Sequence, residues 1–299
     1  MSSSPNEFER SLLQKAVRRG NENLVEKVVN YLTVVDDQTW LKNRLVVMAY
    51  EECWMYAKEL ILDSNKAKIT GQYKSLSRAV KNKNAAGLAS LAIKFTENAK
   101  GILINDEKTN NSIRSVALGI ENINKFWELI VLEPGYNDNK RVIEITQQHI
   151  KKASFPEDKA MLLSAAYLSV KYPTPEIQMT EPSNDKYFPY WIAIDKHTSA
   201  GKEKYFEACR EIKLDSFTGM QLGFYMEGSL CNQMLDSPYW EQMKLWQLKN
   251  MGFTLEQAVD KWGELKPLII KKTKNVVENM IQRIEDNQVK DPDQFVLFG

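Results

Sequence analysis

The stretch Phe8-Glu9-Arg10-Ser11-Leu12-Leu13-Gln14-Lys15-Ala16-Val17-Arg18-Arg19-Gly20-Asn21-Glu22 decides the fold class of this chain. Its apolar residues recur every three or four positions, the spacing that places side chains on one face of an α-helix. Gly20 and Asn21 then end the helix. The same period returns along the chain, without the strict alternation of a half-buried strand. The sequence therefore predicts an all-α protein, built as a multi-helix array.

Further helices follow from the same period and from capping and breaking residues. One is expected to carry Leu24 to Leu32, and another Trp40 to Ala49. The segment from Glu133 to Asn139 predicts a turn. The remaining helices are expected near 51–63, 72–81, 84–99, 111–131, 140–152, 156–171, 199–212, 216–234, 238–250, 254–262 and 265–286.

The segment from Tyr172 to Tyr190 interrupts this helical pattern. It holds four prolines, at positions 173, 175, 182 and 189. Proline removes a backbone donor and breaks helices, so the segment is the best boundary in the chain. We therefore expect a helical domain over 1–172, a second helical part over 173–286 and a tail over 287–299.

Composition indicates an ordinary soluble chain. The 299 residues carry a formal net charge of +1, with 43% hydrophobic and 26% charged residues. Near-neutrality means that any contact with DNA must come from local patches. Three scattered cysteines and two histidines predict no disulfide framework, no metal site and no cofactor. We expect a reducing, cytoplasmic location, because residues 1–6 do not resemble a signal peptide and no apolar run could span a membrane.

The last residues combine a polar leash with apolar anchors. Residues 285–293 are charged and contain Pro292, which is typical of a mobile segment. After them come Gln294, an amide that donates and accepts hydrogen bonds, and the apolar Phe295, Leu297 and Phe298. The pattern Gln-x-x-Leu-Phe resembles the peptide that replication and repair proteins insert into the pocket of a DNA sliding clamp. An alternative is that the tail folds back and buries its phenylalanines in the core.

Two motifs near the start resemble the C-terminal helical region of the RarA (MgsA) family of replication-associated AAA+ ATPases. The first is the opening stretch, and the second is Arg44-Leu45-Val46-Val47-Met48-Ala49-Tyr50-Glu51-Glu52. The resemblance covers about the first 60 residues and extends weakly to about residue 130. Residues that match the family pattern are Ser11, Leu13, Lys15, Arg18, Arg44, Leu45, Ala49 and Glu51.

The resemblance implies an all-helical region that mediates self-association beside a clamp-loader-like motor. The motor itself is missing, because no Gly-x-x-x-x-Gly-Lys-(Ser/Thr) loop is present. Gly201-Lys202 lacks the preceding glycine, and Glu203 follows it. ATP hydrolysis is therefore not carried over to this chain, whereas a homo-oligomer is an expectation.

One stretch could carry chemistry. Four aromatic residues between positions 187 and 191 precede Asp195-Lys196-His197-Thr198. Aromatic rings stack on unpaired bases, and a carboxylate beside a histidine can assist base excision. Asp195 and His197 would then be catalytic residues of a glycosylase-like or nuclease-like site. The alternative is that Asp195 or Thr198 caps the helix that starts near 199, while the aromatic rings pack in the core.

Clusters of basic residues could contact DNA phosphates. Lys74, Arg78 and Lys81 are spaced four and three apart, which would place them on one helical face, and Lys83 extends that face. Other clusters are Lys151-Lys152 and Lys271-Lys272 with Lys274. The alternative for each cluster is a solvated surface without a ligand. Glu51 or Glu52 is expected to pair with Arg44 or Lys58.

These features together predict a non-motor accessory protein of DNA replication or repair. Its partners would be the sliding clamp, bound through the tail, and DNA. One alternative is a DNA-base-processing enzyme with its pocket at Tyr187–Thr198. Another is an oligomeric helical scaffold that does not bind DNA.

Overall fold

The computed structural model describes residues 6–55, 68–153, 155–173, 176–183 and 187–287, and it confirms the all-α class. Within these ranges the only β-type pairings are three isolated bridges. The α-helices are α1 (Glu7–Arg18), α2 (Glu22–Val34), α3 (Gln38–Cys53), α5 (Ile69–Arg78), α6 (Asn84–Thr96), α7 (Glu107–Glu121), α8 (Ile123–Val131), α9 (Tyr136–Lys152), α10 (Pro156–Lys171), α11 (Ser199–Glu211), α12 (Ser216–Gly223), α13 (Pro238–Asn250) and α14 (Leu255–Asp286). A 3-10 turn, η1 (Tyr190–Ala193), and a π-helical turn, η2 (Phe224–Gly228), complete the described elements.

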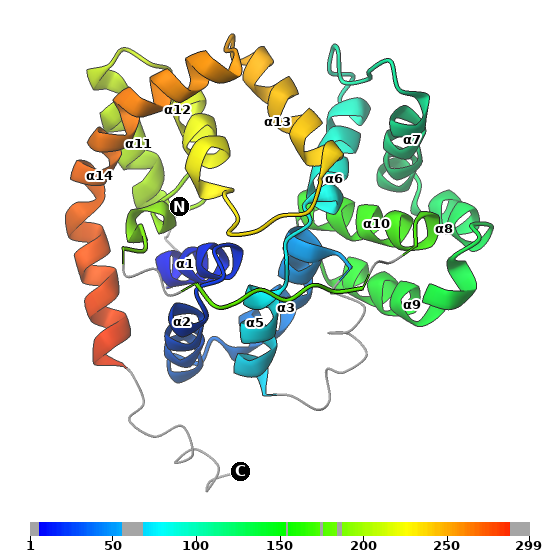
Figure 1. Ribbon diagram of the computed structural model, residues 1–299, viewed down its shortest axis with the longest axis horizontal. Coiled ribbons are helices and arrows are strands. Elements are labelled where there is room, and N and C mark those ends of the chain that lie inside the picture. The colour runs from blue at the N-terminus through cyan, green and yellow to red at the C-terminus, as the bar shows by residue number, and fades with distance from the viewer. Residues whose placement is uncertain (1–5, 56–67, 154, 174–175, 184–186, 288–299) are drawn as a thin grey trace, which may run out of the picture.

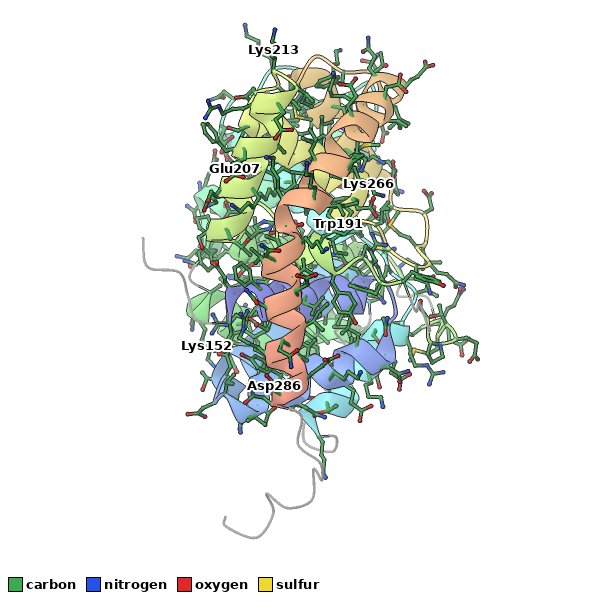
Figure 2. The ribbon with its side chains drawn as sticks, turned by 90° about the vertical axis from the view of Figure 1, so that its left-hand side faces the viewer. Lys152, Trp191, Glu207, Lys213, Lys266 and Asp286 are labelled. Carbon is green, nitrogen blue, oxygen red and sulfur yellow. The ribbon has the colours of Figure 1, made fainter. Side chains whose placement is uncertain are left out.

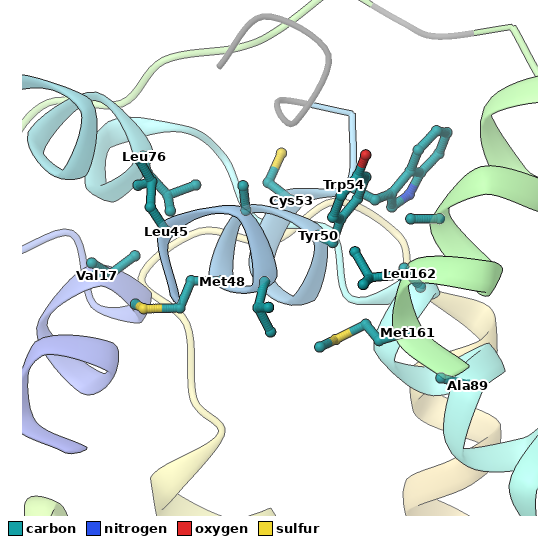
Figure 3. Packing of buried hydrophobic residues seen from close by; sticks show 14 of the residues in the cluster. Val17, Leu45, Met48, Tyr50, Cys53, Trp54, Leu76, Ala89, Met161 and Leu162 are labelled. Carbon is teal, nitrogen blue, oxygen red and sulfur yellow. The ribbon is translucent and has the colours of Figure 1, made fainter. Parts of the chain in front are cut away.

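The helices form two groups that meet at α3 (Figure 1). One group holds α1, α2, α11, α12 and α14, and the other holds α6 to α10. Figure 3 shows α3 in the middle, with Val17 of α1 on one side of it and Met161 and Leu162 of α10 on the other. Because α3 contributes buried side chains toward both groups, it joins them into one body.

The main cluster of buried apolar side chains runs almost the whole length of the chain. It begins at Leu12 and includes Phe188, Tyr239 and Ile284, so it combines residues from both sides of the predicted boundary at residue 172. A second, smaller cluster around Trp262 lies entirely beyond that boundary. The main core is therefore shared by the two parts of the chain that the predicted boundary separates.

A short extended segment at Ala79–Lys83 fixes the centre of the fold. The predicted helix over 72–81 is wrong at its end, because α5 stops at Arg78. The backbone N–H of Val80 donates to Gln178 O (2.9 Å), and that of Asn82 donates to Glu52 O (2.8 Å). Lys81 exchanges backbone hydrogen bonds with residues 233 and 235. These bonds connect the segment to three parts of the chain that are distant from it in sequence.

Local signals set several helix ends. Asn21 caps α2 by accepting from Leu24 N (3.0 Å), and Pro156 starts α10, where its missing N–H costs nothing. Thr254 and Gln257 form a capping box at α14. The predicted break near residue 263 is wrong, since α14 continues through Pro267 as one helix of 32 residues.

Two other predicted helices are interrupted. The predicted helix over 111–131 divides at Asn122, whose side chain caps α8 by accepting from Lys125 N (3.2 Å). In place of the predicted helix over 216–234, the chain forms α12, which ends at Gly223, and then η2. The predicted turn at 133–139 is partly wrong, because α9 already begins at Tyr136. None of the described helices is long and apolar enough to cross a membrane.

Candidate functional site

Helix α1 carries charged side chains into the interior. Arg18 is 1% exposed, and its guanidinium donates to the carboxylates of Glu51 and Glu52 on α3. The same guanidinium donates to the carbonyl of Gly228 in η2 (3.0 Å). Burial disfavours its charge, but the two carboxylates outweigh that effect and raise the pKa of Arg18. Arg18 therefore joins α1, α3 and η2 at one point.

The predicted catalytic carboxylate belongs to the same buried cluster. Asp195 Oδ2 lies 2.6 Å from Lys15 Nζ, and Asp195 Oδ1 accepts from the backbone N–H of His197 (2.9 Å). The imidazole Nδ1 of His197 is 3.1 Å from the same oxygen, while 60% of that side chain remains exposed. Burial raises the pKa of Asp195, but Lys15 and then His197 outweigh it and hold that pKa well below its usual range.

This arrangement is poorly suited to general-base catalysis. A carboxylate already held by an ammonium group and a backbone N–H has little tendency to accept a proton at neutral pH. The capping prediction for Thr198 is confirmed, since its hydroxyl accepts from Gly201 N (3.0 Å) at the start of α11. The neighbouring aromatic residues pack inward in part: Phe188 lies in the main core, and Trp191 stacks near Trp262.

The charged cluster continues outward through α3. Glu51, already held by Arg18, accepts from Gln14 Nε2 (2.5 Å) and lies 3.4 Å from Arg44. The predicted pairing of Arg44 with one of the two glutamates is therefore confirmed, while Lys58 lies outside the described residues. Arg44 also contacts Asp158 of α10 (3.1 Å). Burial raises the pKa of Glu51, but Arg18 and Arg44 together lower it to about 2.

The predicted basic stripe over Lys74, Arg78, Lys81 and Lys83 is wrong as a surface feature. Lys81 and Lys83 are 2% and 0% exposed, because the chain leaves the helix at Ala79 and turns inward. Lys81 Nζ donates to three backbone carbonyls near the end of α5, those of Leu76, Ser77 and Ala79. It thereby satisfies orphan carbonyls of that helix end.

Lys83 and the two remaining members of the stripe also have partners within the protein. Lys83 Nζ lies 3.5 Å from Glu52 and 4.5 Å from the centroid of the Trp240 ring. Lys74 pairs with Glu26 (2.8 Å), and Arg78 donates to Thr180 O (3.2 Å). Their charges hold the fold together and do not form a continuous face for phosphates.

The second basic cluster lies on α14, which begins at Leu255 and runs down one face of the molecule past Lys266 to Asp286 (Figure 2). Lys272 pairs with Glu211 of α11 (2.6 Å), so its charge is neutralised. Lys271 and Lys274 are exposed, and Lys274 lies 3.9 Å from Glu278. The predicted clamp-binding residues Gln294, Phe295, Leu297 and Phe298 lie outside the described residues.

Sequence reasoning missed a pocket at the outer end of the charged cluster. The pocket has a volume of about 200 Å³ and lies between α3, the end of α9 and the start of α10. It is lined by Trp40, Asn43, Arg44, Val47, His149, Lys152, Ala153, Phe155 and Asp158. The only signal in the sequence was the adjacency of Lys151-Lys152 to Phe155 and Pro156, a basic pair beside an aromatic residue at a helix start.

Over the described residues, no group of three or more His, Cys, Asp or Glu side chains is arranged to hold a metal ion. Cys209 and Cys231 are free thiols. The acidic side chains that do gather in the interior are each held by cations, as shown for Glu51, Glu52 and Asp195.

No family model, no curated protein and no solved structure matches this chain. What the fold and the contacts define is an all-α protein with a buried ionic cluster and one small mixed pocket beside it.

Proposed function

We propose that this protein is a non-motor accessory protein of DNA replication or repair that is recruited to a sliding clamp. The observation that carries the proposal is the Gln294-x-x-Leu297-Phe298 pattern, which follows a polar, proline-containing segment. The glutamine supplies a directional hydrogen bond, and the two apolar side chains fill a hydrophobic pocket. Phe295 stands where the bacterial form of the peptide usually has leucine, which keeps the position apolar.

The contacts of the helical body favour an accessory role over a catalytic one. Several residues that match the RarA family pattern form ion pairs within the fold, among them Lys15, Arg18 and Glu51. Asp195, the best catalytic candidate of the sequence, is likewise held by Lys15 and His197. A body whose charged motifs stabilise its own helices fits a carrier or an adaptor.

The position of α14 fits delivery to DNA. Lys271 and Lys274 are exposed on that helix, 12 to 15 residues before its end at Asp286. At a rise of 1.5 Å per residue they lie about 20 Å from the start of the segment that carries the peptide. In a complex with the clamp, these two exposed lysines of α14 would be in a position to approach the DNA that the clamp encircles.

The expected affinity is modest. Burying a leucine and a phenylalanine stabilises a complex by about 1.5–3 kcal/mol each, and the entropy of association opposes it. We therefore expect weak, reversible binding, which suits recruitment during replication.

Titration calorimetry against bacterial and phage sliding clamps tests the proposal. We expect the full chain to bind and the double variant Leu297→Ala/Phe298→Ala to lose detectable binding. The matched control is Val296→Ala, which alters an apolar residue at an unspecified position of the pattern and should bind as the full chain does. Equal binding by the double variant and the full chain, or no binding by either, would contradict the proposal for those clamps.

A further inference from the structure

Two aromatic side chains, Trp40 and Phe155, line the pocket between α3, α9 and α10. Phe155 precedes α10 and is 65% exposed, although it is among the residues that line the pocket. Trp40 lines the pocket from α3, and the guanidinium of Arg10 lies 5.0 Å from the centroid of its ring. Trp40 is thus held by a neighbour, whereas the exposed Phe155 retains much of its apolar surface for a ligand.

The polar groups of the pocket are suited to a planar ligand with hydrogen-bonding edges. Asn43 offers both a donor and an acceptor. Asp158 is oriented by Arg44, whose Nη1 donates to both of its oxygens (3.1 and 3.3 Å). Burial and the nearby Lys152 lower the pKa of His149, so its imidazole is neutral at physiological pH and can donate at one nitrogen and accept at the other.

Uncompensated positive charge surrounds this pocket. Lys152 lines it, Lys151 is adjacent, and Lys159 lies one turn along α10 from Phe155. All three are exposed, and none has an ion-pair partner among the described residues. The carboxylate of Asp158 is already paired with Arg44, and the exposed Glu157 beside it offsets the charge of one of the three lysines. An anion next to the pocket would therefore meet net positive charge.

We propose that this pocket binds one unpaired base of single-stranded DNA, with the flanking phosphates on Lys152 and Lys159. A volume of about 200 Å³ is below the 300–1,000 Å³ of typical pockets for drug-sized ligands, so it fits a single ring system and not a dinucleotide. Stacking on aromatic side chains tolerates every base, and the lysines recognise the backbone whatever its sequence. The site contains no residue of the clamp-binding segment, so the two proposals can be tested independently of each other.

A stacked duplex cannot present a base to such a pocket without unpairing it. The geometry therefore predicts a preference for single strands over duplex. An aromatic side chain of a peptide has a similar shape, but the exposed lysines around the pocket favour a polyanion. Binding of a peptide in place of the single strand would therefore contradict the proposal.

Fluorescence anisotropy of a labelled twenty-nucleotide oligothymidylate, titrated with the full chain at low salt, tests the site. Removal of one stacking ring weakens binding by about 5- to 150-fold, and Phe155→Ala is expected within that range. Lys152→Gln should weaken binding and reduce its salt dependence. Matched controls are Phe217→Ala, an exposed phenylalanine on α12 (55% exposed), and Lys249→Gln at the end of α13, both expected to bind as the unaltered chain does.

Three outcomes would overturn the site: unaltered binding by Phe155→Ala, tighter binding of a twenty-base-pair duplex than of the single strand, or displacement of the strand by a peptide of residues 288–299. Circular dichroism of each variant establishes that it is folded, and the exposure of Phe155 makes loss of folding an unsuitable explanation. Clamp binding by Phe155→Ala, measured in parallel, is expected to be unchanged. Loss of strand binding with retained clamp binding separates this site from the recruitment peptide.

Discussion

Helices α1 and α10 are both buried, but they are buried by different means. In α10, eleven consecutive residues from Ala160 to Val170 are inaccessible, and the two polar ones, Ser164 and Ser169, donate to carbonyls four residues back. In α1, the buried residues include Glu9, Lys15 and Arg18 beside the apolar ones. The buried segment of α10 carries no charged side chain, whereas the buried face of α1 is held by ion pairs as well as by packing.

The two kinds of burial differ in how strictly they determine which side chains must lie opposite each other. Apolar packing tolerates exchanges of similar volume, whereas a buried charge is stable only opposite its own counter-charge. The charges of α1 reach elements far apart in sequence: Arg18 reaches α3, Lys15 reaches Asp195, and Glu9 accepts from Arg283 of α14 (2.7 Å). The ionic helix therefore determines how distant segments assemble, while α10 supplies apolar burial.

The largest expected effect follows from breaking the ionic helix at its centre. Arg18→Met keeps much of the side-chain volume but leaves Glu51 and Glu52 without their main counter-charge. Removing one partner of a buried pair typically costs about 3–5 kcal/mol. Urea denaturation should therefore show a loss of that size in the free energy of unfolding.

The double variant Arg18→Met/Glu51→Gln tests the explanation. With Glu51 neutral, Glu52 keeps Lys83 (3.5 Å) and Arg44 keeps Asp158 (3.1 Å) as counter-charges, and we expect much of the lost stability to return. If the double variant is less stable than Arg18→Met, the loss arises from packing, and the comparison between the two helices fails.

The apolar helix should respond to a cavity. Leu162 of α10 is fully buried in the main core, near α3 (Figure 3). Leu162→Ala is expected to cost about 3 kcal/mol, within the usual range for such a truncation. Leu132→Ala is the control, because that leucine is 85% exposed and its truncation should change stability by less than about 0.5 kcal/mol. A loss below about 1 kcal/mol for Leu162→Ala would show that α10 packs loosely.

Much of this architecture could be predicted from the sequence, because apolar spacing and caps are local signals. The period of Leu12, Leu13, Ala16 and Val17 predicted α1, and Pro156 predicted the start of α10. The inward path of Lys81 could not be predicted in this way. It depends on hydrogen bonds to residues 178, 233 and 235, which lie about 100 residues or more further along the chain.

The candidate sites show the same difference: a contact set by local spacing could be predicted, and a pocket formed by long-range packing could not. Local spacing suggested that Glu51 or Glu52 pairs with Arg44, and Glu51 does. The pocket was missed because Trp40 and Phe155 are 115 positions apart, and only the packing of α3 against α10 brings them together. Long-range contacts that rest on single residues leave no period in the sequence.

Acid should weaken the ionic helix more than the apolar one. The pKa of Glu51 is about 2 in the folded protein and near 4.5 when unperturbed, so its contribution is complete above pH 4.5 and is lost as pH falls toward 2. Glu51→Gln should therefore lower stability at pH 7 by roughly 3 kcal/mol and flatten its fall between pH 4.5 and 2. Urea titrations at several pH values measure the slope, with Glu128→Gln, an exposed residue of α8, as the control. Equal slopes for Glu51→Gln and the unaltered chain would contradict the assignment.

Alkali should have the smallest effect, and of opposite sign. Lys196 donates to Gln221 Oε1 (3.1 Å) and lies 4.1 Å from the centroid of the Phe224 ring. Burial, opposed in part by Asp195, lowers the pKa of Lys196 to about 8. Between pH 8 and about 10 the unfolded chain holds this proton more tightly than the folded one, so stability rises with pH. Lys196→Met should remove roughly 2 kcal/mol of that rise. Lys202 is an exposed lysine on α11, and Lys202→Met should leave the rise intact. A rise that survives in Lys196→Met would assign it to another group.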